Sequence, residues 1–71
     1  MTNTNLLRKK IEESGLKLQF IADKLGISRA TLTAKINGTS EFNQTEIQTL
    51  CDLLNIKSLK EKNSIFFFLF K

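Results

Sequence analysis

Apolar residues recur at the spacing of an α-helix in four successive stretches of this chain. Residues three and four positions apart share one face of a helix, so each stretch predicts a helix with one buried side. The apolar residues are Leu6, Leu7 and Ile11, then Leu18, Ile21, Ala22 and Leu25, then Leu32 and Ile36, and then Ile47, Leu50, Cys51 and Leu54. Every segment with a clear apolar period has the helical period. We therefore expect an all-α fold, a compact domain of four to five short helices.

Residues that favour helix ends separate these stretches. Gly15 and Gly26 adopt the left-handed conformation without a Cβ penalty, and glycine is typical of the position after a helix. Ser28 is a good N-cap for the third helix. That helix is expected to stop at Asn37-Gly38, a strong turn dipeptide.

The remaining segments carry weaker signals. The polar residues 1–4 are expected to fray, because nothing near them in the sequence holds them. Asn43, followed three positions later by Glu46, resembles a capping box and predicts the start of the fourth helix. Ile56 and Leu59 are expected to cover the core after that helix.

The composition argues against an enzyme. The 71 residues include no His, which removes the usual general base and the commonest metal ligand. The single Cys excludes an internal disulfide and a multi-thiolate metal site. We therefore expect one domain, residues 1–71, with no catalytic residues, no metal, no cofactor and no small-molecule substrate. The absence of disulfides is typical of the cytoplasm, and no apolar run is long enough to cross a membrane.

Positive charge is concentrated in the first half of the chain. Residues 1–40 contain seven Lys or Arg residues against three Asp or Glu, whereas residues 41–71 contain four of each kind. A basic half beside a neutral half indicates a surface for a polyanion. A net charge of +4 also keeps a small domain soluble, so charge alone does not identify the partner.

Residues 18–38 combine two short helices with a tight turn between them. Gly26 permits positive φ in that turn, and the small side chain of Ala22 lets the two helices approach closely where they cross. Ile27 and Leu32 are expected to fill the space between the helices. The outward side of the second helix then stays free, and the segment is predicted to be a helix-turn-helix.

This segment resembles the helix-turn-helix of the Cro and phage-repressor (Xre) family. The matching features are Ala22, Gly26 four residues later, Leu32 six residues after that, the run Ser28-Arg29-Ala30-Thr31 and the exit Asn37-Gly38. The resemblance covers about residues 5–56 and implies a lambda-repressor-like DNA-binding domain with its motif at about 18–38. The family often has Thr-Gln where this chain has Lys17 and Leu18, so Lys17 or Gln19 is the candidate for the phosphate contact made there.

The predicted mechanism follows from groove geometry. The major groove of B-DNA, about 12 Å wide, admits one α-helix, and the second helix of the motif enters it with its N-terminal end first. Arg29 at that end can pair with guanine O6 and N7. Lys35 and the loop after the helix, through backbone N–H groups and short hydroxyls, are placed for phosphates. The predicted DNA-contacting residues are Gln19, Ser28, Arg29, Ala30, Thr31, Thr33, Lys35, Asn37, Thr39 and Ser40.

These inferences predict a cytoplasmic, sequence-specific DNA-binding transcriptional regulator. Its recognition helix, residues 28–36, would enter the major groove of double-stranded operator DNA. The resemblance implies a phage or prophage repressor or a Cro-like protein. The alternative is a modulator that keeps the helix-turn-helix scaffold but binds a protein such as a phage repressor.

The last residues of the chain are unusually apolar. The run from Ile65 to Phe70 contains four of the six Phe residues and cannot place every side chain in one small core. Exposed apolar patches of this kind usually mark partner surfaces. We therefore predict a homodimer through residues 65–70, which suits a protein that reads two half-sites about 34 Å apart. The alternative is that part of this segment packs on the first and fourth helices within one protomer while the rest is disordered.

Overall fold

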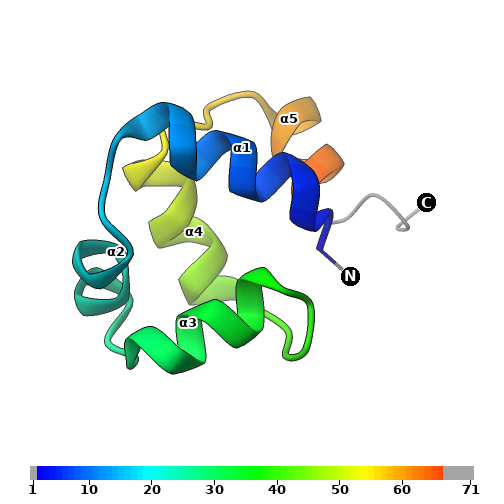
Figure 1. The fold of residues 1–71 in the computed structure, drawn as a ribbon. Coiled ribbons are helices and arrows are strands. Elements are labelled where there is room, and N and C mark those ends of the chain that lie inside the picture. The colour runs from blue at the N-terminus through cyan, green and yellow to red at the C-terminus, as the bar shows by residue number, and fades with distance from the viewer. Residues whose placement is uncertain (1, 67–71) are drawn as a thin grey trace.

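The computed structural model describes residues 2–66, and this part of the chain forms five α-helices and no strand (Figure 1). The helices are α1 (Thr4–Ser14), α2 (Leu18–Leu25), α3 (Arg29–Ile36), α4 (Gln44–Leu53) and α5 (Leu59–Phe66). α2 packs against both α3 and α4, whereas α1 packs against α3 and α5. The prediction of a compact all-α domain is confirmed.

Each of the five helices contributes one large, fully buried side chain to a single core. These five residues are Leu7, Ile21, Leu32, Leu50 and Ile65. Ala22 is also fully buried, on the helix that contacts both α3 and α4. Burial of apolar surface stabilises a fold by roughly 25 cal/mol per Å². It is the main stabilising contribution here, since no disulfide adds to it: the lone cysteine, Cys51, is free and buried.

The turn between α2 and α3 has the conformation that its residues predict. Gly26 lies in the left-handed region with φ at 74°. The Ile27 N–H donates to the Ala22 carbonyl oxygen at 3.1 Å, which closes a Schellman motif at the end of α2. The Ser28 hydroxyl oxygen then accepts the Thr31 N–H at 3.0 Å and caps α3. A turn of three residues, held at both ends, therefore sets the direction in which α3 leaves α2.

Two expectations, one about the first residues and one about Leu59, are wrong. Residues 2–4 do not fray: the Asn3 side chain caps α1, and the Asn3 N–H donates to the Ile65 carbonyl oxygen at 2.6 Å. That partner lies far along the chain, so local sequence gave no sign of it. Leu59 does not cover the core, because it is 70% exposed at the start of α5, whereas Ile56 is buried as expected.

The prediction that residues 65–70 face a partner is corrected for its first two residues. Ile65 and Phe66 are buried within the protomer, where α5 turns them toward the core. The Phe66 ring meets the Phe42 ring edge to face, with 6.0 Å between the ring centroids. The rest of the predicted dimer segment, residues 67–70, lies outside the described residues.

Candidate nucleic-acid interface

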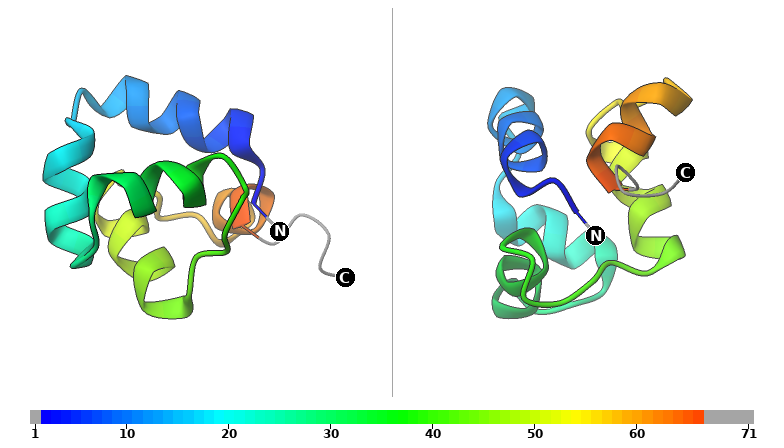
Figure 2. Two further views of the ribbon diagram at one scale, coloured as in Figure 1. Left: turned by 60° about the horizontal axis from the view of Figure 1, so that its bottom comes forward. Right: turned by 90° about the vertical axis from the view of Figure 1, so that its right-hand side faces the viewer.

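α3 lies at the edge of the molecule, and no element of the described chain covers its outer side (Figure 2). Leu32 and Ile36 point into the core. The exposed residues of the outer side are Arg29, Ala30, Thr31 and Thr33. The second helix of the predicted motif is therefore held from behind by apolar side chains and is accessible from the front.

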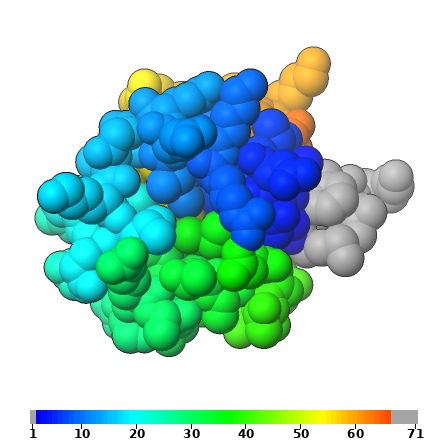
Figure 3. All heavy atoms as spheres, in the orientation of Figure 1, coloured from blue at the N-terminus to red at the C-terminus, as the bar shows by residue number. Residues whose placement is uncertain are grey.

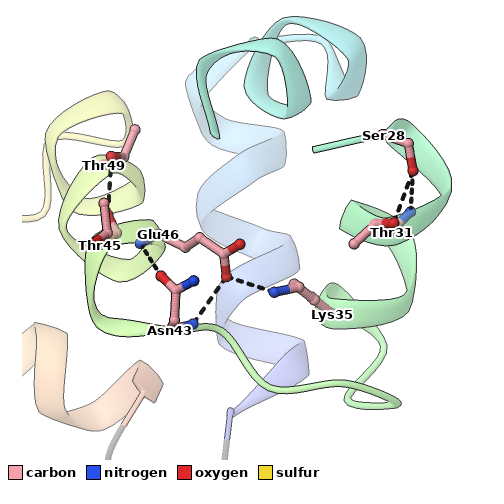
Figure 4. Close-up of polar contacts among 7 residues, drawn as sticks. All are labelled: Ser28, Thr31, Lys35, Asn43, Thr45, Glu46 and Thr49. Carbon is pink, nitrogen blue, oxygen red and sulfur yellow. Dashed lines mark hydrogen bonds and ion pairs between the residues drawn. The ribbon is translucent and has the colours of Figure 1, made fainter. Parts of the chain in front are cut away.

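The first turn of α3 is ordered by its cap. The Ser28 hydroxyl donates to Thr31 Oγ1 at 2.9 Å, and the same Ser28 oxygen accepts the Thr31 N–H (Figure 4). Both hydrogen bonds are exposed at the surface. The Thr31 side chain consequently has a defined position beside the exposed residues Arg29 and Ala30.

Lys35 does not occupy the position expected of a phosphate contact. It points from α3 toward α4, and its Nζ lies 2.7 Å from Glu46 Oε1 (Figure 4). The side chains of Lys35 and Glu46 are only 14% and 8% exposed. The Lys35 ammonium also lies 6.0 Å from the centroid of the Phe42 ring. The cause is tertiary, because α4 brings a carboxylate to the side of α3 on which Lys35 stands.

Glu46 belongs at the same time to the cap of α4. The Asn43 side chain accepts the Glu46 N–H at 2.8 Å, while Glu46 Oε1 accepts the Asn43 N–H at 2.9 Å. This is the predicted capping box, which is confirmed. Burial alone would raise the pKa of Glu46, but the hydrogen bonds from Lys35 and from the Asn43 N–H hold that pKa below its ordinary value. The carboxylate is therefore charged at neutral pH.

The other predicted contact residues flank α3. Gln19 is exposed on α2, and its side-chain amide donates to Asp23 Oδ1 at 2.9 Å. Asn37, Thr39 and Ser40 are exposed in the loop that follows α3.

One expectation about this loop is wrong. The backbone N–H groups of residues 37–40 all donate to carbonyl oxygens of residues 33–35, so none is free for a phosphate. Only side chains of the loop remain for that contact, because the C-terminal cap of α3 uses the backbone donors.

One residue near α3 was missed by sequence reasoning. The Arg8 guanidinium on α1 donates to Asn37 Oδ1 at the end of α3. Arg8 and Asn37 also line an open, mainly apolar hollow between α1, the start of α2 and α3. α1 and α3 lie next to each other on the face shown in Figure 3. The contact joins residues 29 positions apart, and no local pattern in the sequence indicates it.

No group of three or more His, Cys, Asp or Glu within residues 2–66 is placed to hold a metal ion. Burial raises the pKa of the Cys51 thiol, which lies on the buried side of α4. No helix in the same range is long and apolar enough to cross a membrane.

A short helix pair joined by a three-residue turn, with the second helix exposed, defines a helix-turn-helix DNA-binding domain. A helix-turn-helix family model matches residues 7–61, which include the motif and most of the surrounding helices. The chain belongs to this family, of the Xre and Cro type. No curated protein and no solved structure matches it. The family is a non-enzymatic one that binds double-stranded DNA, and the protein is a DNA-binding regulator of this class.

Proposed function

We propose that this protein is a sequence-specific transcriptional regulator that binds operator DNA with α3 in the major groove. The observation that carries the proposal is the exposed N-terminal half of α3. The ion pairs within the described residues are Lys10–Glu61 and Lys35–Glu46, so the exposed Arg29 guanidinium is available for guanine O6 and N7. Ala30 and the methyl groups of Thr31 and Thr33 offer apolar contacts to thymine methyls.

Phosphate contacts on either side of α3 fix the register of the protein on the duplex. Gln19 and Lys17 at the start of α2 are exposed on one side. The side chains of Asn37, Thr39 and Ser40 are exposed on the other. Binding that depends on such contacts weakens as salt concentration rises, because each neutralised phosphate releases counterions.

The biological role we propose is that of a phage or prophage repressor or a Cro-like protein, which acts by occluding polymerase at its operator. The motif residues shared with the Cro and phage-repressor family support this role. We further propose that the protein binds as a homodimer, with two copies of α3 in half-sites about 34 Å apart. Since Ile65 and Phe66 are buried in the protomer, residues 67–70 are the part of the apolar segment proposed to join two copies.

The test is a fluorescence-anisotropy titration of the full chain with the DNA upstream of its own coding sequence. Arg29→Ala is expected to weaken specific binding by about 1–3 kcal/mol. Lys57→Ala, which removes the same charge from an exposed position outside the motif, serves as the matched control. An equal loss from both variants would reduce the role of Arg29 to net charge.

The same titration separates the two classes of function. Wild-type protein that prefers no sequence over random DNA would contradict the operator-binding proposal. That result would favour the alternative of a helix-turn-helix scaffold that binds a protein regulator. Sedimentation of the full chain and of a chain that ends at Phe66 tests the dimer, which is expected only for the full chain.

A further inference from the structure

We infer that Arg8 on α1 contacts the DNA phosphate backbone at the C-terminal end of α3, where the sequence predicts a contact from Lys35. This inference rests on the proposed function, because it extends the DNA-binding surface from the helix-turn-helix to α1. It follows from where Arg8 lies, from the charge it keeps and from the partner that Lys35 has.

The Arg8 side chain reaches Asn37, so its guanidinium lies beside the loop after α3. Arg8 and Asn37 share one open hollow with Thr33 of the exposed α3 surface and with Leu18 at the start of α2. A DNA backbone that runs along the outer side of α3 and the start of α2 consequently passes close to the Arg8 guanidinium.

Two ion pairs join residues within the described part of the chain, and they use Lys10 and Lys35. The partner of Arg8 is a neutral carboxamide, so this contact takes one guanidinium donor without placing a negative charge on Arg8. An Arg guanidinium has five N–H donors, so it can bond Asn37 and a phosphate oxygen at the same time. The Asn37 contact holds the long side chain in place and lowers the entropy cost of that second bond.

A helix-turn-helix protein needs phosphate contacts on both sides of the recognition helix to set its register. At the C-terminal end of α3, the Lys35 ammonium is bonded to Glu46 and is largely covered. Arg8 reaches this end of α3 through Asn37 and is exposed to solvent.

The hollow also limits where the phosphate can lie. Glu12 stands one helical turn after Arg8 and lines the same hollow. Its carboxylate repels a phosphate, so the contact belongs at the Asn37 end of the hollow and not in its interior.

The experiment measures the salt dependence of operator binding for the full chain. Each phosphate contact contributes about 0.9 to the slope of log K against log salt, which corresponds to about eightfold in affinity for each tenfold change in salt concentration. Arg8→Gln is expected to reduce the slope by about 0.9 and to weaken specific and non-specific binding equally. Lys9→Gln removes the same charge from an adjacent exposed position that points elsewhere on α1 and is expected to leave the slope nearly unchanged.

Lys35→Met supplies the complementary measurement. It is expected to lower the thermal midpoint without changing the slope, because Lys35 acts inside the protein. A slope unchanged by Arg8→Gln, or lowered equally by Lys9→Gln, would overturn the inference while Arg29→Ala still disrupted binding. A lower slope for folded Lys35→Met would return the phosphate contact to Lys35. Failure of the wild-type protein to bind DNA would overturn the proposed function as well.

Discussion

At the scale of single residues, the ion pair between Lys35 and Glu46 ties the last turn of α3 to the first turn of α4. One carboxylate oxygen, Glu46 Oε1, accepts both from Lys35 Nζ and from the Asn43 N–H. Loss of one partner of a largely buried pair leaves a charge without compensation and costs more than the pair itself contributes. Breaking the pair is therefore expected to destabilise the packing of α3 against α4.

Glu46 gives the stability of the protein a defined pH dependence. Its pKa is lower in the folded protein than its ordinary value of 4.5, so it contributes stability that is complete above that value and lost as pH falls through the lower, folded pKa. The thermal midpoint of Glu46→Gln should lie below that of the wild type at pH 7, and the difference should shrink below about pH 4.5. Glu12→Gln, at an exposed position, is the control. A difference that stays constant from pH 7 to pH 3 would contradict this assignment.

Gly26 gives a second prediction at this scale. A Cβ added at Gly26 would meet no atom within 4 Å, yet φ is +74°, so the cost of a substitution is conformational and not steric. Gly26→Ala is expected to lower the free energy of unfolding by about 1–2 kcal/mol. Gly26→Asn should cost less, because Asn tolerates the left-handed region. Chemical denaturation measures both, and an equal cost for the two variants would point to packing as the cause.

At the scale of elements, the short turn and the two caps determine how α3 is presented. The Schellman motif after α2 and the Ser28 cap leave little freedom in residues 26–28. The core side of α3 is then anchored by Leu32 and Ile36. The orientation of the recognition helix is consequently a property of the motif and of the helices packed behind it.

Ser28 allows stability and DNA binding to be separated. Ser28→Ala removes the N-cap and should lower the free energy of unfolding by about 1 kcal/mol. Ser28→Asp keeps a good cap and should retain the stability of the wild type. Its negative charge faces the duplex in the proposed complex, so DNA affinity should fall. Thermal unfolding and anisotropy titration of both variants test this, and wild-type affinity of Ser28→Asp would place the start of α3 away from DNA.

At the scale of the whole molecule, the two ends of the described chain close the core together. α5 packs against α1, and the Asn3 N–H donates to the carbonyl oxygen of Ile65. Lys10 and Glu61 form an ion pair across the same two helices. A domain of this size buries only about 60% of its unfolded surface and is marginally stable, and these contacts join its first and last described helices.

The position of Phe66 predicts where the chain can be shortened. Phe66 is 2% exposed, and Phe→Ala changes in a core cost about 3–5 kcal/mol. Phe66→Ala should therefore abolish or nearly abolish cooperative thermal unfolding, whereas a chain that ends at Phe66 should unfold cooperatively. Leu59→Ala, on the exposed side of the same helix, should stay within about 0.5 kcal/mol of the wild type. Circular dichroism during heating compares the three, and normal unfolding of Phe66→Ala would show that α5 is dispensable.

The sequence by itself determined α1 to α4 and the turn between α2 and α3. Gly15, Gly26, Ser28 and the Asn43–Glu46 box act within about four residues of the chain, and the apolar period marks the buried side of each helix. Such short-range interactions are legible in a sequence because both partners lie in the same few residues. The outward side of α3, and with it the candidate DNA surface, follows from the same period.

Only the tertiary structure decided α5, the ion pair of Lys35 and the position of Arg8. In α5 five polar residues separate Leu59 from Ile65 and Phe66, so its apolar pattern is weak, and this helix is held by contacts with α1. Whether Lys35 meets a phosphate or Glu46 depends on how α3 and α4 are rotated against each other. That rotation is fixed by packing between segments far apart in the chain, which no local pattern records.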